Sequence, residues 1–216
     1  NTPFLVHDWL KHQHRDEFWQ HGSICEDFSK VQAAVLTVGS WGDAYSNAVP
    51  RLLRSLDGRT RAIIGPWVHK YPHFAVPQPA IGFLQEALRW WDRWLKDEPT
   101  DVETDARMRV YLMDSVRPQG WYASRPGQWY ALQTWPSAAD DTALNLCLAP
   151  GRLGTSAATG ESVEVSSPLS VGIASGEYCA IWLGPEMPTD QRVDDGGSTL
   201  FDGEILPHDV AIVGAP

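Results

Sequence analysis

The sequence has few cysteines and no long apolar run, and both shortages exclude classes of protein. Its three cysteines, Cys25, Cys147 and Cys179, are far apart and form no CxxC pair, which argues against a disulfide scaffold and favours buried free thiols in a reducing compartment. No stretch approaches the roughly 20 apolar residues that a membrane-spanning helix needs. No charged-then-apolar leader follows Asn1. We therefore expect no membrane association and a cytoplasmic location.

Basic residues are also scarce, with 17 Lys and Arg against 27 Asp and Glu and a net charge of −10. No basic stretch stands out, so we expect no nucleic-acid partner. Hydrophobic residues make up 43% and charged residues 20% of the chain, which is typical of a globular protein with a core. Eleven tryptophans predict large packed surfaces or pocket walls.

The first hundred residues show the pattern of an α/β fold. Residues 33–38 and 62–64 are continuous apolar segments, typical of strands that are buried on both faces of a parallel sheet. Between them, Pro50 suits the first turn of a helix and Gly58 suits its end. The apolar residues of this helix fall on one face: Val49, Leu52, Leu53 and Leu56. The segment therefore predicts a strand–helix–strand unit.

Residues 80–99 predict an amphipathic helix that ends before Pro99. Its expected buried stripe is Leu84, Ala87, Leu88, Trp91, Trp94 and Leu95. Its expected solvent face is Arg89, Asp92, Arg93 and Lys96, and Trp90 is expected to face a following domain.

After about residue 105 the apolar residues alternate with a period of two, as in 107–112, 143–148, 163–165 and 178–183. Clusters of Gly, Pro and Ser separate these segments, which predicts a β-sandwich or jelly roll. The fold class expected is thus α/β followed by all-β, with a domain at 31–100, a linker near 100–106 and an incomplete jelly roll at 106–216.

Two polar residues follow the two predicted strands. Asp43 comes after the first strand and His69 after the second. Since the carboxyl ends of parallel strands meet at one rim of a sheet, these side chains are expected to lie together. A carboxylate that accepts a hydrogen bond from imidazole Nδ1 leaves Nε2 free to take a proton from a serine. A structural aspartate and a loop histidine are the alternative.

The residues around this pair carry a family resemblance. WGDAY (41–45) and GPWVH (65–69) resemble the GW-x-D and GPW-x-H blocks of the family of cocaine esterase, α-amino acid ester hydrolases, glutaryl acylases and Xaa-Pro dipeptidyl-peptidases. Further matching blocks are HRDEFWQHGSI, WWDRWLK, RMRVYLMDS and TDQRVDDGGSTLF. The resemblance implies an α/β-hydrolase with a helical cap, which would end within residues 1–30, and a C-terminal jelly roll.

The same resemblance implies roles for residues. Asp43 would be the triad acid and His69 the general base of a serine hydrolase that acts on ester, amide or peptide bonds, with no cofactor or metal. Tyr45 would lie near the acyl pocket, and Trp67 would help to shape the loop that presents His69. Trp41 and Trp67 are also candidates for the wall of the substrate site, and a core position for Trp41 is an equal alternative.

The sequence departs from the family in lacking a GxSxG-type nucleophile elbow. Ser40 has Val38 two residues before it and belongs to the strand end of Asp43, while Ser156 lies in the β-rich half. We therefore expect an internal piece of a larger enzyme, inactive alone, whose partners are the missing N-terminal segment and, in an oligomer, further copies of itself. The exposed edge of such a piece would favour aggregation.

Other features have simpler explanations. The histidines at 7, 12, 14 and 21, with Asp8 and Asp16, match no established zinc spacing, and His12 and Asp16 fit a surface i,i+4 pair. DQRVDDGG (190–197) could bind calcium, but a turn between strands is the preferred interpretation because the EF-hand spacing is absent. The rival function is a non-catalytic β-sandwich that binds carbohydrate or protein, attached to a degenerate hydrolase.

Overall fold

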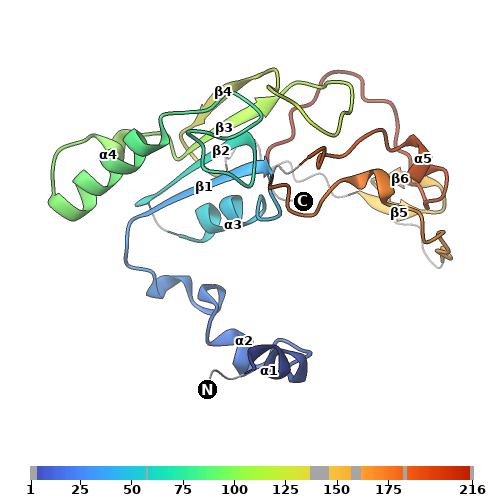
Figure 1. Cartoon of the computed structure of the whole chain (residues 1–216), viewed down its shortest axis with the longest axis horizontal. Coiled ribbons are helices and arrows are strands. Elements are labelled where there is room, and N and C mark those ends of the chain that lie inside the picture. Colours follow the sequence, from blue (N-terminus) through green and yellow to red (C-terminus); the bar gives the residue numbers. More distant parts are fainter. Residues whose placement is uncertain (1–3, 57, 137–145, 157–161, 182–183, 215–216) are drawn as a thin grey trace.

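The computed structural model describes residues 4–56, 58–136, 146–156, 162–181 and 184–214. A four-stranded sheet in the order β1-β2-β3-β4 forms its centre, with helices on its flanks (Figure 1). The elements up to the sheet's second strand are α1 (Leu5–Lys11), α2 (Glu17–Gln20), η1 (Ile24–Glu26), η2 (Phe28–Lys30), β1 (Val35–Gly42), α3 (Ala48–Ser55) and β2 (Thr60–Val68). Then come α4 (Phe83–Lys96), η3 (Val102–Thr104), β3 (Met108–Met113), β4 (Gly127–Leu132), β5 (Cys147–Ala149), β6 (Arg152–Gly154), η4 (Ile173–Ser175) and α5 (Arg192–Asp195).

The predicted strand–helix–strand unit is present. β1 and β2 pair in parallel, with Val35 opposite Thr60, and α3 connects them. Val49 and Leu53 on α3 are buried to 3% and 0% exposure, as the helical periodicity predicts. They pack against Ala62 and other residues of the sheet. Hydrophobic burial by this one helix face therefore fixes α3 on the sheet.

Both strands are longer than the sequence predicts, because glycines continue them. Gly39 lies inside β1, where a Cβ would come within 2.6 Å of Val49 Cγ2. Gly65 lies inside β2, where a Cβ would come within 2.5 Å of the Trp67 ring. Gly39 thus lets α3 pack close to β1, and Gly65 leaves room for the Trp67 ring, so each strand runs on to the rim where the polar residues lie.

The sheet continues past the boundary expected at residues 100–106. β3 pairs with β2 in parallel, and β4 pairs with β3 in antiparallel fashion. The prediction that the strand at 108–113 opens a separate jelly roll is therefore wrong for this strand. Met108 and Val110 are buried in the same cluster as Val49 and Leu53, and this shared core explains why β3 joins the first sheet.

Helix α4 has the predicted extent but not the predicted orientation. Ala87 and Trp90 are its buried residues, whereas most of the expected stripe is more than half exposed: Leu84, Leu88, Trp91 and Leu95. Arg89 and Arg93, expected on the solvent face, form ion pairs with Asp105 and Glu103. These ion pairs and the burial of Trp90 settle which side of the helix faces the protein.

A bidentate ion pair links α4 to β3. Arg109 donates from Nη1 and Nη2 to the two carboxylate oxygens of Glu86, at 2.9 and 2.8 Å. Hydrogen bonding by Arg109 holds the pKa of the Glu86 carboxyl below its usual range. Parallel hydrogen bonds of this kind fix the geometry of both partners, so the pair orients α4 against the sheet.

Arg107 joins the end of α3 to the start of β2. Its guanidinium donates to the carbonyls of Leu53 and Leu56 at 2.9 and 2.8 Å, and to that of Thr60 at 3.0 Å. The two leucine carbonyls lie at the helix C-terminus, where backbone acceptors have no partner within the helix. We expect Arg107→Met to lower the free energy of unfolding by about 2–3 kcal/mol, measured by urea denaturation.

The matched control for this prediction is Arg54→Met, which removes an exposed guanidinium from the same helix. It should change the free energy of unfolding by no more than about 0.5 kcal/mol. Equal effects of the two substitutions would show that the carbonyl contacts of Arg107 do not stabilise the fold.

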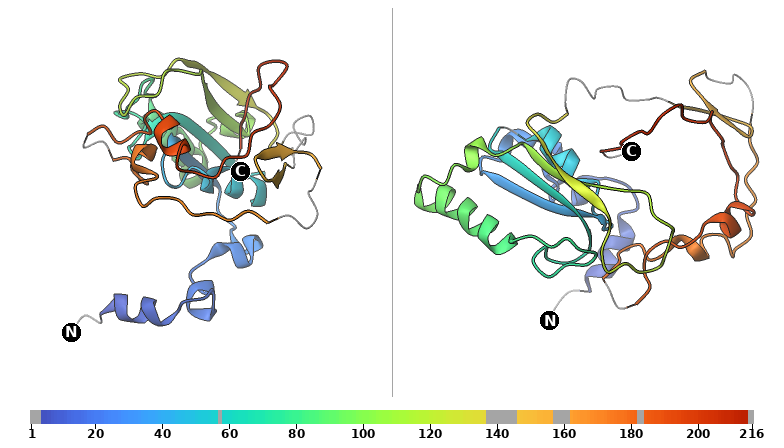
Figure 2. Two further views of the ribbon diagram at one scale, coloured as in Figure 1. Left: turned by 90° about the vertical axis from the view of Figure 1, so that its right-hand side faces the viewer. Right: turned by 90° about the horizontal axis from the view of Figure 1, so that it is seen from above.

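The described residues after 145 contain little regular structure. β5 and β6 form a two-stranded antiparallel sheet, and a long connection arches from it around one side of the molecule (Figure 2). Residues 162–165 and 178–181 form no strand, contrary to the alternating pattern, and residues 143–145 and 182–183 lie outside the described ranges. The jelly roll expected at 106–216 is thus not seen among the described residues.

The segment expected as a turn between strands is instead helical. Residues 192–195 form α5, and Arg192 pairs with Asp190, holding the pKa of that carboxyl at about 2. Asp194 is 8% exposed and its Oδ2 accepts a hydrogen bond from the backbone N–H of Ala174 at 2.9 Å. Asp194 therefore ties this part of the chain together rather than facing solvent.

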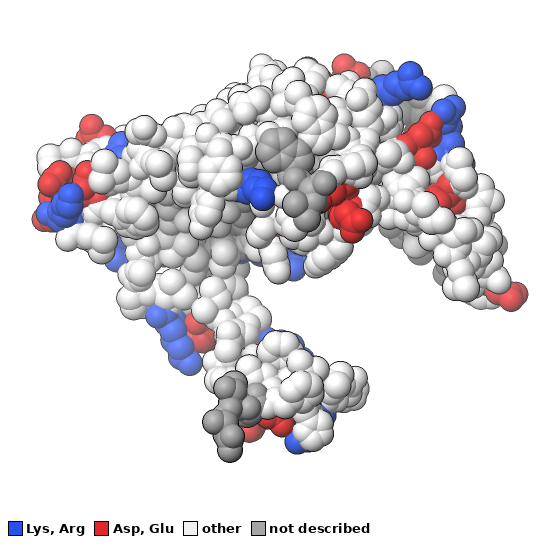
Figure 3. Space-filling view, in the orientation of Figure 1, with Lys and Arg blue, Asp and Glu red and all other residues white. Residues whose placement is uncertain are grey.

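Residues 4–30 extend away from the sheet and contain no buried residue (Figure 1). Within them, His12 Nδ1 lies 2.6 Å from Asp16 Oδ2, which is the surface pair that the spacing indicates. The helices in the described parts of the chain are all too short or too polar to cross a bilayer. Figure 3 shows charged side chains of both signs gathered near α4 and few of them over the middle of the same face.

Candidate active site

The register of β1 and β2 brings Asp43 and His69 together. Gly42, the last residue of β1, pairs with Val68, the last residue of β2. Asp43 directly follows β1, and His69 directly follows β2. The pairing of the two strands therefore places these two residues next to each other.

A bulge makes this register possible. Ser40 pairs with Gly65, so an undisturbed ladder would set Gly42 opposite Trp67, but the register shifts by one residue between Ser40 and Gly42. Gly42 is required at this point, since a Cβ there would lie 2.9 Å from the Trp67 carbonyl oxygen. Bulges of this kind commonly redirect side chains at functional sites.

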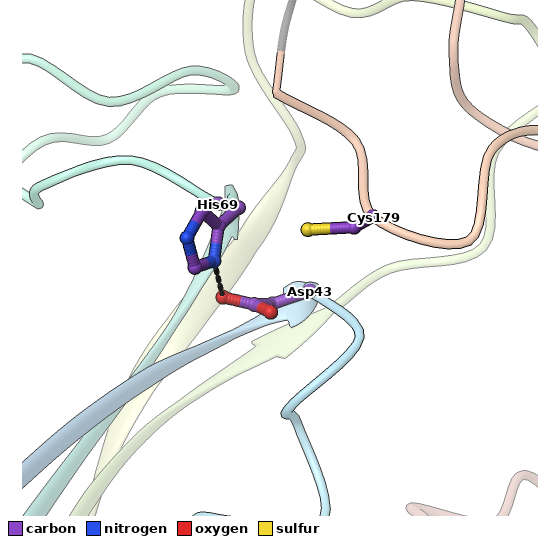
Figure 4. A group of neighbouring side chains, drawn as sticks. All are labelled: Asp43, His69 and Cys179. Carbon is purple, nitrogen blue, oxygen red and sulfur yellow. Dashed lines mark hydrogen bonds and ion pairs between the residues drawn. The ribbon is translucent and has the colours of Figure 1, made fainter. Parts of the chain in front are cut away.

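The carboxylate and the imidazole form a hydrogen bond. His69 Nδ1 lies 2.8 Å from Asp43 Oδ2 (Figure 4). Since an ionised carboxylate only accepts hydrogen bonds, Nδ1 carries the proton and Nε2 is the basic nitrogen. Figure 4 shows Nε2 directed away from Asp43, which leaves it available to a second group.

The two side chains differ in exposure. The Asp43 side chain is 12% exposed and that of His69 is 49% exposed. The other oxygen of Asp43, Oδ1, accepts from the backbone N–H of Tyr45 at 2.9 Å, which fixes the carboxylate. The backbone N–H of His69 donates to the Ala180 carbonyl at 2.9 Å. Both ends of the pair are thus held by the backbone.

The three aromatic candidates occupy different surroundings. Tyr45 is 63% exposed, and its ring centroid is 6.0 Å from that of His69, so it borders the site. Trp41 packs against the core cluster, and its Nε1 donates to the Tyr111 carbonyl at 2.8 Å, which favours the core alternative. Trp67 is 1% exposed, so the prediction of a substrate contact does not fit it. It lies two residues before His69 and packs in a buried cluster with Ile63 and Ala75.

Neither Ser40 nor Ser156 is expected to be the nucleophile, and Ser40 is engaged elsewhere. It is 3% exposed, and its Oγ donates to the Val68 carbonyl at 3.2 Å. Ser156 is exposed. Ser40 therefore stabilises the pairing of β1 with β2.

One neighbour of the pair was missed by sequence reasoning. The Cys179 thiol lies beside Asp43 and His69 (Figure 4), although nothing in its spacing signals this. All three cysteines are free thiols, as predicted, but Cys25 is exposed and neither Cys147 nor Cys179 is fully buried, contrary to the expectation of burial.

Residues 1–71, which include both Asp43 and His69, match the family described as X-Pro dipeptidyl-peptidase (S15 family). No curated protein matches the chain. Two crystal structures titled as a CocE/NonD family hydrolase from Staphylococcus aureus are similar, with TM-scores of 0.53 and 0.51 and identities of 15% and 13%. Each similarity covers 71% of this chain and 26% of the other.

These comparisons support the family resemblance predicted from the sequence. The mixed sheet with its flanking helices resembles a partial hydrolase fold. The chain spans about a quarter of the length of the structures that it resembles.

Proposed function

We propose that this chain supplies the acid and the base of a serine hydrolase of the X-Pro dipeptidyl-peptidase and CocE/NonD type. The observation that supports this most directly is the 2.8 Å contact between His69 Nδ1 and Asp43 Oδ2, within the stretch that matches the family. The nucleophilic serine would come from outside these 216 residues, so the chain alone would be inactive.

In this mechanism His69 Nε2 removes the proton from the serine hydroxyl as the oxygen attacks the carbonyl carbon of the substrate. Asp43 stabilises the resulting imidazolium, and the imidazolium then gives its proton to the leaving alcohol or amine. His69 next removes a proton from water, which attacks the acyl-enzyme and releases the acid. No metal or cofactor takes part in these steps.

The substrate class is an ester, an amide or an Xaa-Pro peptide. Tyr45 is the residue best placed to contact the acyl group, since it is exposed beside His69. We further propose that the cap ends within residues 1–30, that the hydrolase domain includes residues 31–100 together with β3 and β4, and that the part of the expected 106–216 domain that follows β4 belongs to a jelly roll completed by other strands.

The rival function, a binding module without catalysis, has less support. A sandwich that binds ligands on a sheet face requires a broad face, and the described residues after 145 offer only the short strands β5 and β6. Such a module also gives no reason for an acid–imidazole pair at the ends of β1 and β2.

The state of the His69 ring tests the proposal on the chain itself. We expect nitrogen-detected NMR to show that the uncharged form of the His69 ring carries its proton on Nδ1, because the Asp43 carboxylate accepts there. Asp43→Asn should abolish this preference, since an amide can turn its N–H₂ toward the ring. His73, whose ring stacks on Phe83, is the control and should be unaffected. A His69 ring protonated on Nε2 in the unaltered chain would contradict the proposal.

A further inference from the structure

The thiol of Cys179 forms a compact group with the acid–base pair. One donor atom from each of Asp43, His69 and Cys179 lies within 4.8 Å of the other two. The thiol approaches from a segment far along the chain from β1 and β2, and its Sγ points toward the pair (Figure 4). The proposed hydrolytic mechanism makes no use of it.

Contacts that do not involve the thiol hold this segment in place. Ala180, the next residue, is 2% exposed and accepts the backbone N–H of His69 at 2.9 Å. The backbone N–H of Glu177 donates to the Glu186 carbonyl at 2.8 Å, and the backbone N–H of Met187 donates to the Gly120 carbonyl at 2.8 Å. These backbone contacts therefore set the position of Cys179.

The thiol is poorly placed to act as a nucleophile. A cysteine nucleophile would give its proton to the free nitrogen of the imidazole, which is Nε2. Figure 4 shows Nε2 on the far side of the ring from Cys179, while Nδ1 faces both the thiol and Asp43. The group therefore converges on the space beside Nδ1.

A thiolate, an imidazole nitrogen and a carboxylate oxygen are all zinc ligands, and three protein ligands plus one water complete a tetrahedral site. Metal–ligand bonds of about 2.0–2.3 Å place the ligand atoms about 3.5 Å apart. The Nδ1–Oδ2 distance of 2.8 Å must therefore widen, whereas the thiol already lies within 4.8 Å of the other two ligand atoms. The His69 side chain is half exposed, so it has room for such a shift.

We propose that Asp43, His69 and Cys179 form a site for a borderline-soft divalent cation, with Zn²⁺ as the preferred ion. The metal takes the position of the Nδ1 proton, which leaves to water while Nε2 takes up a proton from water, and the thiol proton is also released to water. Binding thus replaces the Asp43–His69 hydrogen bond with coordination. One consequence rests on the proposed function: zinc at this site would remove the orientation that His69 needs as a base and would inhibit the hydrolase reversibly.

Cobalt substitution tests the site without any activity measurement. Co²⁺ added to the 216-residue chain should produce a sulfur-to-cobalt charge-transfer band that saturates at one equivalent and that Zn²⁺ abolishes. Cys179→Ser should lose the band, and competition with a chromophoric chelator should show Zn²⁺ affinity weakened by more than about 100-fold, since even outer-shell changes cost 10–100-fold. His69→Gln should weaken Zn²⁺ binding to a similar degree.

The other two thiols provide matched controls. Cys25→Ser and Cys147→Ser should keep the band and the affinity, since neither residue belongs to the group. The proposal is overturned if the unaltered chain gives no band, if the band survives in Cys179→Ser, or if His69→Gln binds Zn²⁺ as tightly as the unaltered chain. The metal-free ring state of His69 is measured separately, so failure of the metal site leaves the test of the proposed function intact.

Discussion

His69→Gln, made in a longer form of the protein that carries the serine nucleophile, is expected to lower kcat/KM by about 10⁶-fold. Glutamine cannot accept the serine proton, so both acylation and deacylation lose their base. Asp43→Asn is expected to lower kcat by about 10⁴-fold, because the His69 ring keeps its position but no longer holds its proton on Nδ1. Both values would be measured with p-nitrophenyl esters and Xaa-Pro amides.

Two variants separate catalysis from damage to the fold. His73→Gln makes the same substitution at an exposed histidine of the adjoining loop, and it should keep kcat/KM within about tenfold, as expected of a surface change that costs little stability. The 216-residue chain alone should show no His69-dependent hydrolysis. Hydrolysis by the chain alone that disappears in His69→Gln would place the nucleophile within these residues and contradict the proposal.

Trp67→Ala is expected to lower the free energy of unfolding by about 3–5 kcal/mol, a large share of the roughly 5–15 kcal/mol that stabilises a domain. The indole is 1% exposed, packs with Ile63 and Ala75, and donates from Nε1 to the Pro79 carbonyl at 2.7 Å. Loss of the indole would leave a cavity beside Ile63 and Ala75, close to the end of β2 that precedes His69. Urea denaturation followed by circular dichroism measures the change.

A second tryptophan offers a control of the same size. Trp91 on α4 is 56% exposed, so Trp91→Ala should cost no more than about 0.5 kcal/mol. Equal losses in the free energy of unfolding for Trp67→Ala and Trp91→Ala would contradict the prediction that burial makes Trp67 the more stabilising residue.

The local periodicity of the chain predicts much of the sheet and its first helix. Val49 and Leu53 are buried as the helical spacing requires, and Asp43 and His69 lie together because the ends of parallel strands share a rim. The apolar segments 33–38 and 62–64 end before the strands do. Gly39 and Gly65 continue the strands, at points where a side chain would collide with Val49 or Trp67.

Contacts between distant segments are the part that local patterns do not predict. The spacing of Leu84, Leu88 and Trp91 marks an apolar face on α4 but does not say what covers it, and in the structure the ion pairs of Arg89 and Arg93 turn the opposite side inward. Alternation along β3 likewise predicts a strand without naming its neighbour. Cys179 lies at the site because its segment contacts the end of β2 through the Ala180 carbonyl, and no short-range pattern predicts such a contact.

The outer position of β1 in the described sheet has a structural consequence. Its pairing partner lies on one side only, so the backbone donors and acceptors of the other side form a template for one more strand. A strand that docks there in the same direction as β1 must finish next to Asp43, because parallel strands end together. Under the proposed function, the carboxyl end of such a strand, and not its amino end, would lie on the same rim of the sheet as His69.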